Sequence, residues 1–310
     1  MRSGAAQGHV GYFHEAAFYG SDDDFRSVVV PFLDGGVAAG EPVVVACHAA
    51  NERLIRDAVA DPSAIVFLHG DEHYERPTEA ILALRKLFAE YAGAPQIRVM
   101  GDVPHPGVGA SWDWWARYEV SITEVFAEVP VWGLCPYDLR TAPPRVVADV
   151  LSAHPHVVAP DGAHVPNESY RSSWTWPEVP PTGLEADPPL VELVDPAPAE
   201  ARRAVTAACA GARLSRDEVD DIVYAASEAV TNAQCHGVPP VRVRVWAGPT
   251  SVLVAVTDRG EGPRSPVAGL VPTDLTTTAG VGLWLTHRTC REVLMGRDAE
   301  GYTIRLTVGA

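Results

Sequence analysis

The sequence predicts two α/β domains, a doubly wound parallel sheet followed by an α/β sandwich. The chain has 310 residues, which is long enough for two hydrophobic cores. Its first half alternates short runs of Val and Ile with helical patterns, whereas after residue 190 two helices come before most of the strands. A stretch rich in Pro and polar residues separates the two patterns. We therefore predict a first domain over residues 1–159, a linker over 160–189 and a second domain over 190–310.

Unbroken apolar strands characterise the predicted first domain. Strands covered on both faces lose their polar alternation, and helices between successive strands make those strands parallel. The expected strands are Val43–Cys47, Ile65–His69, Ile97–Gly101 and Val131–Cys135. The expected helices are Asp23–Ala38, Asn51–Val59, Pro77–Tyr91, Trp114–Val129 and Pro143–Leu151. Helices on both faces of a parallel sheet define a doubly wound fold.

The second domain shows alternating strands instead. In the run VRVRVW, Val alternates with Arg or Trp, as in a sheet with one buried face. The expected strands are Leu190–Val194, Val241–Trp246, Val252–Thr257 and Tyr302–Val308, and the expected helices are Pro198–Ala210, Asp217–His236 and Val281–Cys290. Helices gathered on one face of a mixed or antiparallel sheet give an α/β sandwich.

Composition excludes several classes of protein. Residues 1–188 carry 12 Lys and Arg against 26 Asp and Glu, and residues 189–310 carry 12 against 14, so the acidity lies in the first part. Such a surface disfavours binding to nucleic acid, which needs a basic face. No apolar run reaches the length of a membrane span, and the N-terminus is a poor secretory signal. Five scattered cysteines without a CxxC argue against a disulfide framework. We expect a cytoplasmic protein that binds neither membrane nor nucleic acid.

The helix that ends in EAVTNAQCH carries the first candidate site. Glu228 and Asn232 are four residues apart, so their side chains lie on one helical face. A carboxylate and an amide oriented together can hold a divalent cation and orient a hydroxyl. Taken alone, the pair is equally compatible with a solvated helix face.

Two glycine-containing segments follow this helix. Asp258 ends a strand and is followed by Gly260 and Gly262 in DRGEG, where the chain can turn sharply and approach a ligand. Its carboxylate can accept a hydrogen bond from an amino group. Gly280 and Gly282 open a helix in GVGL, where backbone amides can meet phosphate. The chain contains no GxxxxGK[ST], which excludes a P-loop.

In this order and spacing the three segments resemble the nucleotide-binding boxes of the GHKL ATPase superfamily. ExxxNAxxH resembles the N box, DRGEG the first glycine box and GVGL the second. The resemblance implies ATP and Mg²⁺ as cofactors, with Asn232 as the Mg²⁺ ligand and Asp258 on the adenine amino group. It also implies that Gly260 and Gly262 shape the adenine pocket and that Gly280 and Gly282 contact the phosphates.

Within that superfamily the domain is most similar to anti-sigma factor serine kinases of the RsbW type. This resemblance implies a sigma factor and a STAS-type anti-anti-sigma antagonist as partners, with Glu228 as the general base toward an antagonist serine. Thr278 stands where kinase-competent members carry an Arg. A binding module without catalysis is therefore the alternative. A sensor histidine kinase is disfavoured because no dimerisation helix with a phosphoacceptor His precedes the domain. A homodimer is left open.

The first domain resembles the MEDS sensory domain, a relative of RecA/KaiC-type domains without the phosphate loop. His14, Phe18 and Tyr19 match the HxxxFY pattern, and Pro136–Asp138 reads PYD. The resemblance implies a sensor of an unidentified ligand or protein partner, with His14 and Tyr19 as candidate contacts. A structural role for His14 is the alternative.

Other residue patterns keep two interpretations each. His236 and His287 are either catalytic or structural, and His69 and His73, four apart, are either zinc ligands or ordinary surface residues. An aromatic cluster either lines a pocket or packs a helix against the core; it comprises Trp112, Trp114, Trp115 and Tyr118.

Overall fold

The computed structural model describes residues 2–109, 112–179, 181–272 and 281–309. They form two compact units, Met1–Ser173 and Trp174–Ala310. Among the described residues, no helix is both long enough and apolar enough to cross a bilayer.

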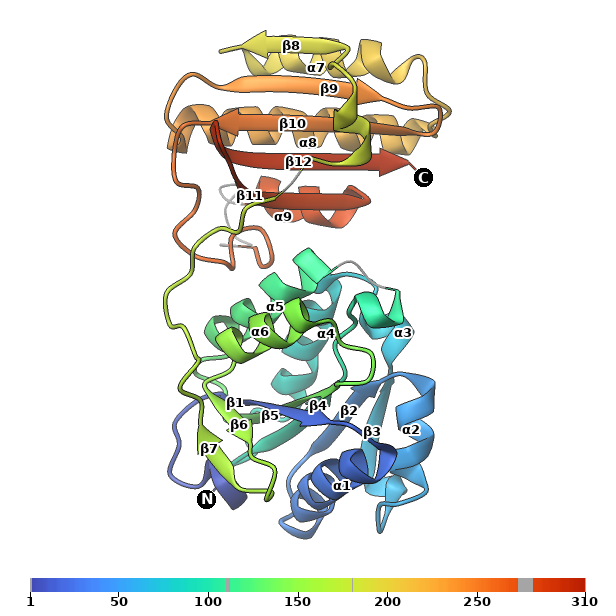
Figure 1. Ribbon diagram of the computed structural model, residues 1–310, viewed down its shortest axis with the longest axis vertical. Helices are drawn as coiled ribbons and strands as arrows, with labels where there is room; N and C mark the ends of the chain where they lie inside the picture. The colour runs from blue at the N-terminus through green and yellow to red at the C-terminus, as the bar shows by residue number, and fades with distance from the viewer. Residues whose placement is uncertain (1, 110–111, 180, 273–280, 310) are drawn as a thin grey trace. The chain divides into compact units, whose positions relative to one another are not determined.

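The first unit is built on a seven-stranded sheet in the order β3-β2-β4-β5-β1-β6-β7 (Figure 1). Five neighbouring strands run parallel, β6 joins them in parallel and β7 pairs antiparallel with β6. The strands are β1 (Phe13–Tyr19), β2 (Val43–Cys47), β3 (Ile65–His69), β4 (Ile97–Gly101), β5 (Val131–Asp138), β6 (His156–Val158) and β7 (His164–Pro166). This confirms the parallel α/β sheet.

Helices cover both faces of this sheet, α1 and α2 on one side and α4, α5 and α6 on the other (Figure 1). The helices are α1 (Asp22–Ala38), α2 (Ala49–Arg56), α3 (Gly70–His73), α4 (Pro77–Glu90), α5 (Trp112–Val125) and α6 (Pro144–Ala153). Local sequence explains where α1 begins. The Ser21 side chain accepts a hydrogen bond from the Asp24 amide (3.1 Å), and three acidic residues of the first turn favour the positive end of the helix dipole.

β1 is the main element of this unit that the sequence patterns did not reveal. It lies between β5 and β6, and all but one of its residues are buried. The adjacent polar residues His14 and Glu15 interrupt its apolar run, so it lacks the signature of a buried strand. Glu15 is nevertheless satisfied, because it accepts hydrogen bonds from Trp132 Nε1 (2.5 Å) and His164 Nδ1 (2.8 Å).

The second unit is a five-stranded antiparallel sheet in the order β11-β12-β10-β9-β8 with helices on one face (Figure 1). Its strands are β8 (Val191–Val194), β9 (Arg242–Ala247), β10 (Ser251–Asp258), β11 (Glu292–Asp298) and β12 (Gly301–Gly309). Its helices are α7 (Pro198–Cys209), α8 (Arg216–His236) and α9 (Val281–Thr289). β11 is absent from the sequence-based expectation, because its apolar run VLM is only three residues long and is flanked by Gly and charged residues.

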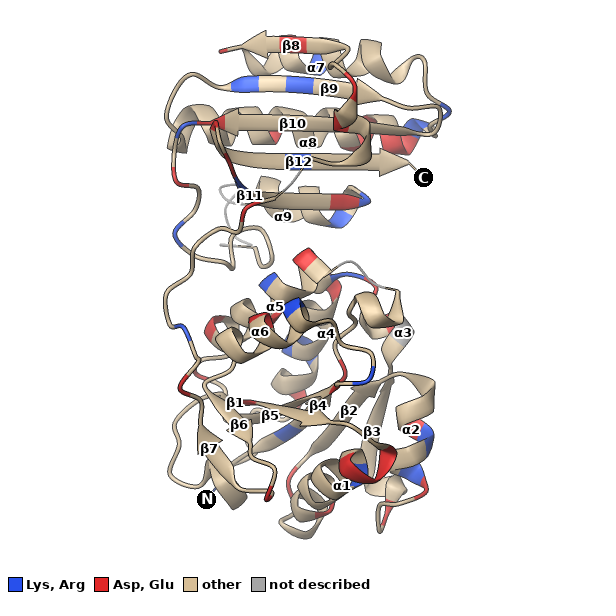
Figure 2. Cartoon of the chain, in the orientation of Figure 1, with Lys and Arg blue, Asp and Glu red and all other residues tan. Residues whose placement is uncertain are grey.

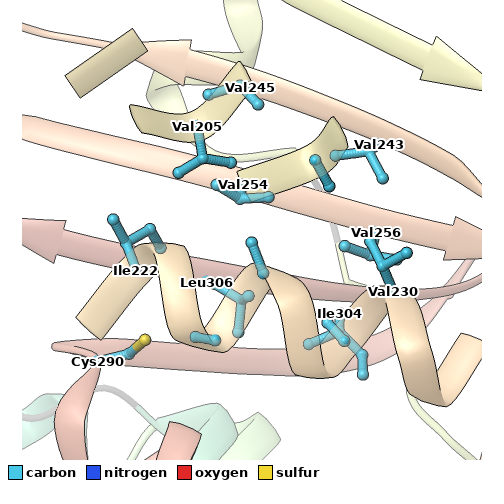
Figure 3. Close-up of a cluster of buried hydrophobic side chains, with 14 of the residues drawn as sticks. Val205, Ile222, Val230, Val243, Val245, Val254, Val256, Cys290, Ile304 and Leu306 are labelled. Atoms are coloured by element: carbon cyan, nitrogen blue, oxygen red, sulfur yellow. The ribbon is translucent and has the colours of Figure 1, made fainter. Parts of the chain in front are cut away.

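Alternation along the strands builds the core of this unit. Val243 and Val245 on β9 and Val254 and Val256 on β10 face α7 and α8, where Ile222 and Val230 meet them (Figure 3). The intervening Arg side chains of β9 lie on the opposite, charged face (Figure 2). There Glu192 forms ion pairs with Arg242 (3.3 Å) and Arg244 (3.2 Å).

The Pro-rich stretch over 160–189 is divided between the two units. His164–Pro166 forms β7 of the first sheet, whereas Trp176 is 7% exposed and belongs to the core of the second unit. The segment also pairs with the edge of β11: Val179 donates its N–H to the Arg297 carbonyl (3.1 Å), and Arg297 donates to the Pro177 carbonyl (2.8 Å). Between these two parts, Arg171–Ser173 are exposed and have no regular structure.

Limited trypsin digestion of the full chain is expected to cut first after Arg171. Proteases prefer exposed segments without regular structure, and Arg171 lies in such a segment at the division between the units. Mass spectrometry of the early fragments should give products that end at Arg171 and begin at Ser172. First cleavage at an arginine within either sheet would contradict this division.

Candidate functional site

A cavity of about 400 Å³ opens in the second unit beside the C-terminal half of α8. The end of β10, the start of β12 and the start of α9 form its other walls. This volume is within the range of small-molecule sites. Its walls are largely apolar, formed by Ala229, Ala233, Val256, Leu283 and Ile304. Glu228, Asn232 and Asp258 supply carboxylate and amide groups to the same cavity, which therefore combines apolar walls with a few polar groups.

Asp258 is held in the cavity wall by hydrogen bonds to the backbone. Its Oδ1 accepts hydrogen bonds from the N–H groups of Val238 (3.0 Å) and Gly260 (2.6 Å), and the side chain is 6% exposed. Within the described part of the chain, no hydrogen bond to Oδ2 is observed. One oxygen thus fixes the carboxylate in place while the other is available to a ligand.

Glu228 and Asn232 lie on the cavity side of α8, one helical turn apart. The helix begins with a capping box, in which Ser215 accepts from the Glu218 amide (3.2 Å) and Glu218 accepts from the Ser215 amide (2.7 Å). Burial raises the pKa of Tyr224, one turn before Glu228, and the Glu228 carboxylate raises it further. Both site residues are half-buried, so their polar ends can reach a ligand and solvent.

Glycines allow the backbone to approach these side chains. A Cβ on Gly260 would lie 2.6 Å from Asp258 Oδ1, and one on Gly237 would lie 2.5 Å from the Ala233 carbonyl oxygen. A Cβ on Gly282 would overlap the Glu228 carboxylate, and one on Gly262 would overlap the Tyr302 ring. Side chains at these positions would therefore fill or distort the cavity.

The structure gathers most of the expected nucleotide-site residues in one place. Glu228, Asn232, Asp258, Gly262 and Gly282 all line the cavity, and Gly260 supports Asp258. Gly280 and Thr278 lie outside the described residues.

The two histidines of the second unit have different environments. His236 is exposed and lines the cavity. His287 is 5% exposed, with its Nε2 3.4 Å from Met295 Sδ. The burial of His287 therefore fits a structural role. His236 keeps both interpretations, since it lines the cavity.

Sequence reasoning missed three further residues that line the cavity: Gly237, Gly269 and Tyr302. Gly237 directly follows the helical pattern of α8, a signal that could have revealed it. Tyr302 is placed there by strand register, because it pairs with Asp258 across β10 and β12. No short motif encodes that pairing.

The sensory candidates of the first unit do not share a site. His14 and Tyr19 are five residues apart on β1 and therefore point to opposite faces of the sheet. Tyr19 packs in the cluster with Phe25 and Val29 of α1.

The aromatic and histidine patterns of this unit are also explained by their burial. Trp112, Trp115 and Tyr118 are at most 4% exposed and pack α5 against the core. His69 is exposed while His73 is buried, and in the described part of the chain neither belongs to a group of three metal-ligand side chains.

Comparison with protein families agrees with this architecture. Residues 13–155 match the model of the MEthanogen/methylotroph, DcmR Sensory domain (MEDS), and residues 194–308 match that of the histidine kinase-like ATPase domain. The chain is a MEDS–ATPase fusion. No curated protein matches the chain. The expected resemblance to both families is thus confirmed, and an ATPase-like domain implies ATP binding.

We expect Gly282→Ala and Gly262→Ala to differ in stability. Gly282 is the second residue of α9 with only the end of the Glu228 side chain in the way, so Ala should be tolerated or add up to about 1 kcal/mol through helix propensity. Gly262 has φ +80° and faces the Tyr302 ring, so Ala should cost at least about 1 kcal/mol. Chemical denaturation of both variants checks this; equal losses would contradict it.

Proposed function

We propose that the ATPase domain binds Mg²⁺–ATP and acts as an anti-sigma factor with serine kinase activity, under control of the MEDS domain. The observation that carries the nucleotide part is the fixed Asp258 carboxylate at the wall of an apolar cavity. Opposite apolar walls accept a flat heterocycle, and a single acceptor oxygen selects a base that presents an amino group. Adenine has that combination.

The residues around the cavity fit the phosphates and metal as well. Asn232 offers an oxygen ligand of the kind that Mg²⁺ prefers, and Glu228 lies one turn away. Gly282 lies at the start of α9, where backbone amides favour anions. A Cβ at this position would overlap the Glu228 carboxylate, so glycine leaves this part of the cavity open. When bound, Mg²⁺–ATP supplies the phosphoryl group for transfer.

Glu228 is our candidate for the general base. Among the described residues it accepts no hydrogen bond, and its carboxylate reaches the cavity from a helix fixed by core packing. A carboxylate in this position can accept the proton of an incoming serine hydroxyl. The proposed substrate is a serine of a STAS-type antagonist, and the proposed competing partner is a sigma factor. Partner exchange would then control transcription.

Asp258→Asn should weaken ATP binding at least about tenfold, because the amide presents a donor where the adenine amino group needs an acceptor. Calorimetry on the full chain with Mg²⁺ checks this. GTP carries a carbonyl instead of that amino group, so the wild-type preference for ATP over GTP should also shrink. Asp220→Asn, on the exposed side of α8, is the matched control. Unchanged affinity and selectivity in Asp258→Asn would exclude this role.

Glu228→Gln should still bind ATP while phosphoryl transfer falls by roughly 10²-fold, since the amide keeps the shape of the side chain but cannot take a proton. The assay follows radiolabel from ATP to candidate STAS-type antagonists. Glu200→Gln, exposed on α7, is the control and should transfer at the wild-type rate. Wild-type transfer by Glu228→Gln would show that another group is the base.

A binding module without catalysis is the second candidate, favoured by Thr278 in the position of the usual Arg. A cation there would stabilise the charge that develops during phosphoryl transfer. A wild-type chain that binds ATP and a sigma factor but labels no antagonist would support this second function. Transfer gained by Thr278→Arg would identify the missing cation as the cause.

A further inference from the structure

A buried cluster of four potential metal ligands lies between the first sheet and the helices α5 and α6. It consists of His14 on β1, Glu119 on α5, Cys135 on β5 and His154 directly after α6. Their four ligand atoms all lie within 4.8 Å of one another, and each residue is at most 4% exposed. Neither the nucleotide cavity nor the proposed kinase chemistry uses them.

The ligand atoms of His14, Glu119 and His154 face one another within the cluster. His154 Nδ1–H donates to the Val150 carbonyl (2.8 Å), so its Nε2 carries a lone pair, and that atom has no hydrogen-bond partner. Glu119 Oε2 lies 3.4 Å from this Nε2 and 3.3 Å from Nε2 of His14. Acceptor atoms this close need a proton or a cation between them.

All four side chains are buried away from water, where an unpaired carboxylate or thiolate is costly. A divalent cation with one carboxylate, one thiolate and two neutral imidazoles has no net charge, which removes the cost of burying unpaired ions.

We propose that this buried cluster is a zinc site of the sensory domain. Zn²⁺ takes four N, O or S ligands in a tetrahedron, and its bond lengths place those ligands roughly 3.3–3.7 Å apart. The two Glu119–His distances above fall in this range, as does His14 Nε2 to Cys135 Sγ at 3.4 Å, while Cys135 Sγ to Glu119 Oε2 is 3.8 Å.

A second layer of contacts orients the ligands. Tyr137 donates its hydroxyl to Glu119 Oε1 (2.5 Å), and Nδ1 of His14 is hydrogen-bonded with the Thr123 hydroxyl (2.9 Å). Such contacts are characteristic of ligands held ready for a metal. Because four protein ligands fill the tetrahedron, the site is structural, and it joins α5 and the end of α6 to the central strands β1 and β5.

The test uses the full chain with Cys235→Ser, which removes the exposed thiol beside His236. Metal-free protein is titrated with Co²⁺, whose thiolate charge-transfer and tetrahedral absorption bands report the ligands directly. We expect about one Co²⁺ per chain, displacement by Zn²⁺, and a higher Tm with Zn²⁺ than after chelation. Folded protein that takes up neither metal would overturn the proposal and leave a neutral hydrogen-bonded cluster.

Variants locate the site. Cys135→Ser should abolish the charge-transfer band, whereas Cys47→Ser, an equally buried thiol on β2 of the same sheet, should retain it. Glu119→Gln can keep the hydrogen bond from Tyr137 and should weaken Co²⁺ binding at least about tenfold. If Cys135→Ser does not fold, the Co²⁺ spectrum of the wild type and the Co²⁺ affinity of Glu119→Gln still test the proposal. Retention of the band in Cys135→Ser, or unchanged affinity in Glu119→Gln, would refute the assignment. ATP binding is measured separately, so failure here leaves the nucleotide proposal intact.

Discussion

The cavity of the second unit depends on the hydrogen bonds that Asp258 Oδ1 accepts. They join the end of β10 to Val238, just after α8, and to the turn at Gly260, so one carboxylate oxygen holds together the three segments that surround it. The Arg259 N–H adds a backbone hydrogen bond between the same segments, because it donates to the Val238 carbonyl (2.8 Å). The constraint also explains Gly237 and Gly260, since a Cβ at either would lie 2.6 Å from Oδ1. One oxygen of this side chain thus has a structural role, and the proposed adenine contact falls to the other.

α8 also separates residues with a structural role from residues that line the cavity, on two adjacent faces of the helix. Its stripe of Ile222, Ala226 and Val230 packs on the sheet, where each buried Val or Ile side chain contributes about 1.5–3 kcal/mol. The adjacent face carries Glu228 and Asn232 into the cavity. The packing of the stripe therefore fixes the position of the polar pair, and no contact between the two polar residues is required.

Sequence patterns predicted what is local and missed what depends on long-range pairing. The β-branched run VVVAC is typical of a buried strand, and the stripe of α8 needs only helical periodicity. β1 was missed because His14 and Glu15 are polar, and their burial is made favourable by Glu119, Trp132 and His164 from distant parts of the chain. Several residues that line the cavity of the second unit were singled out from the sequence because they belong to three short motifs. The buried histidine, glutamate and cysteine cluster has no motif at all, since sheet order alone brings its members together.

The pairing of Pro177 and Val179 with Arg297 gives the second unit a larger extent than its family match. The matched region begins at residue 194, but Trp176 packs edge-to-face against Tyr302 with ring centroids 5.4 Å apart and donates its indole N–H to the Pro263 carbonyl (2.7 Å). A gene fusion that carried only the matched region would uncover this aromatic pair and the free edge of β11. Exposed edges of that kind promote strand-to-strand aggregation between molecules. A second unit that keeps this aromatic pair and this edge covered therefore has to start near Trp174.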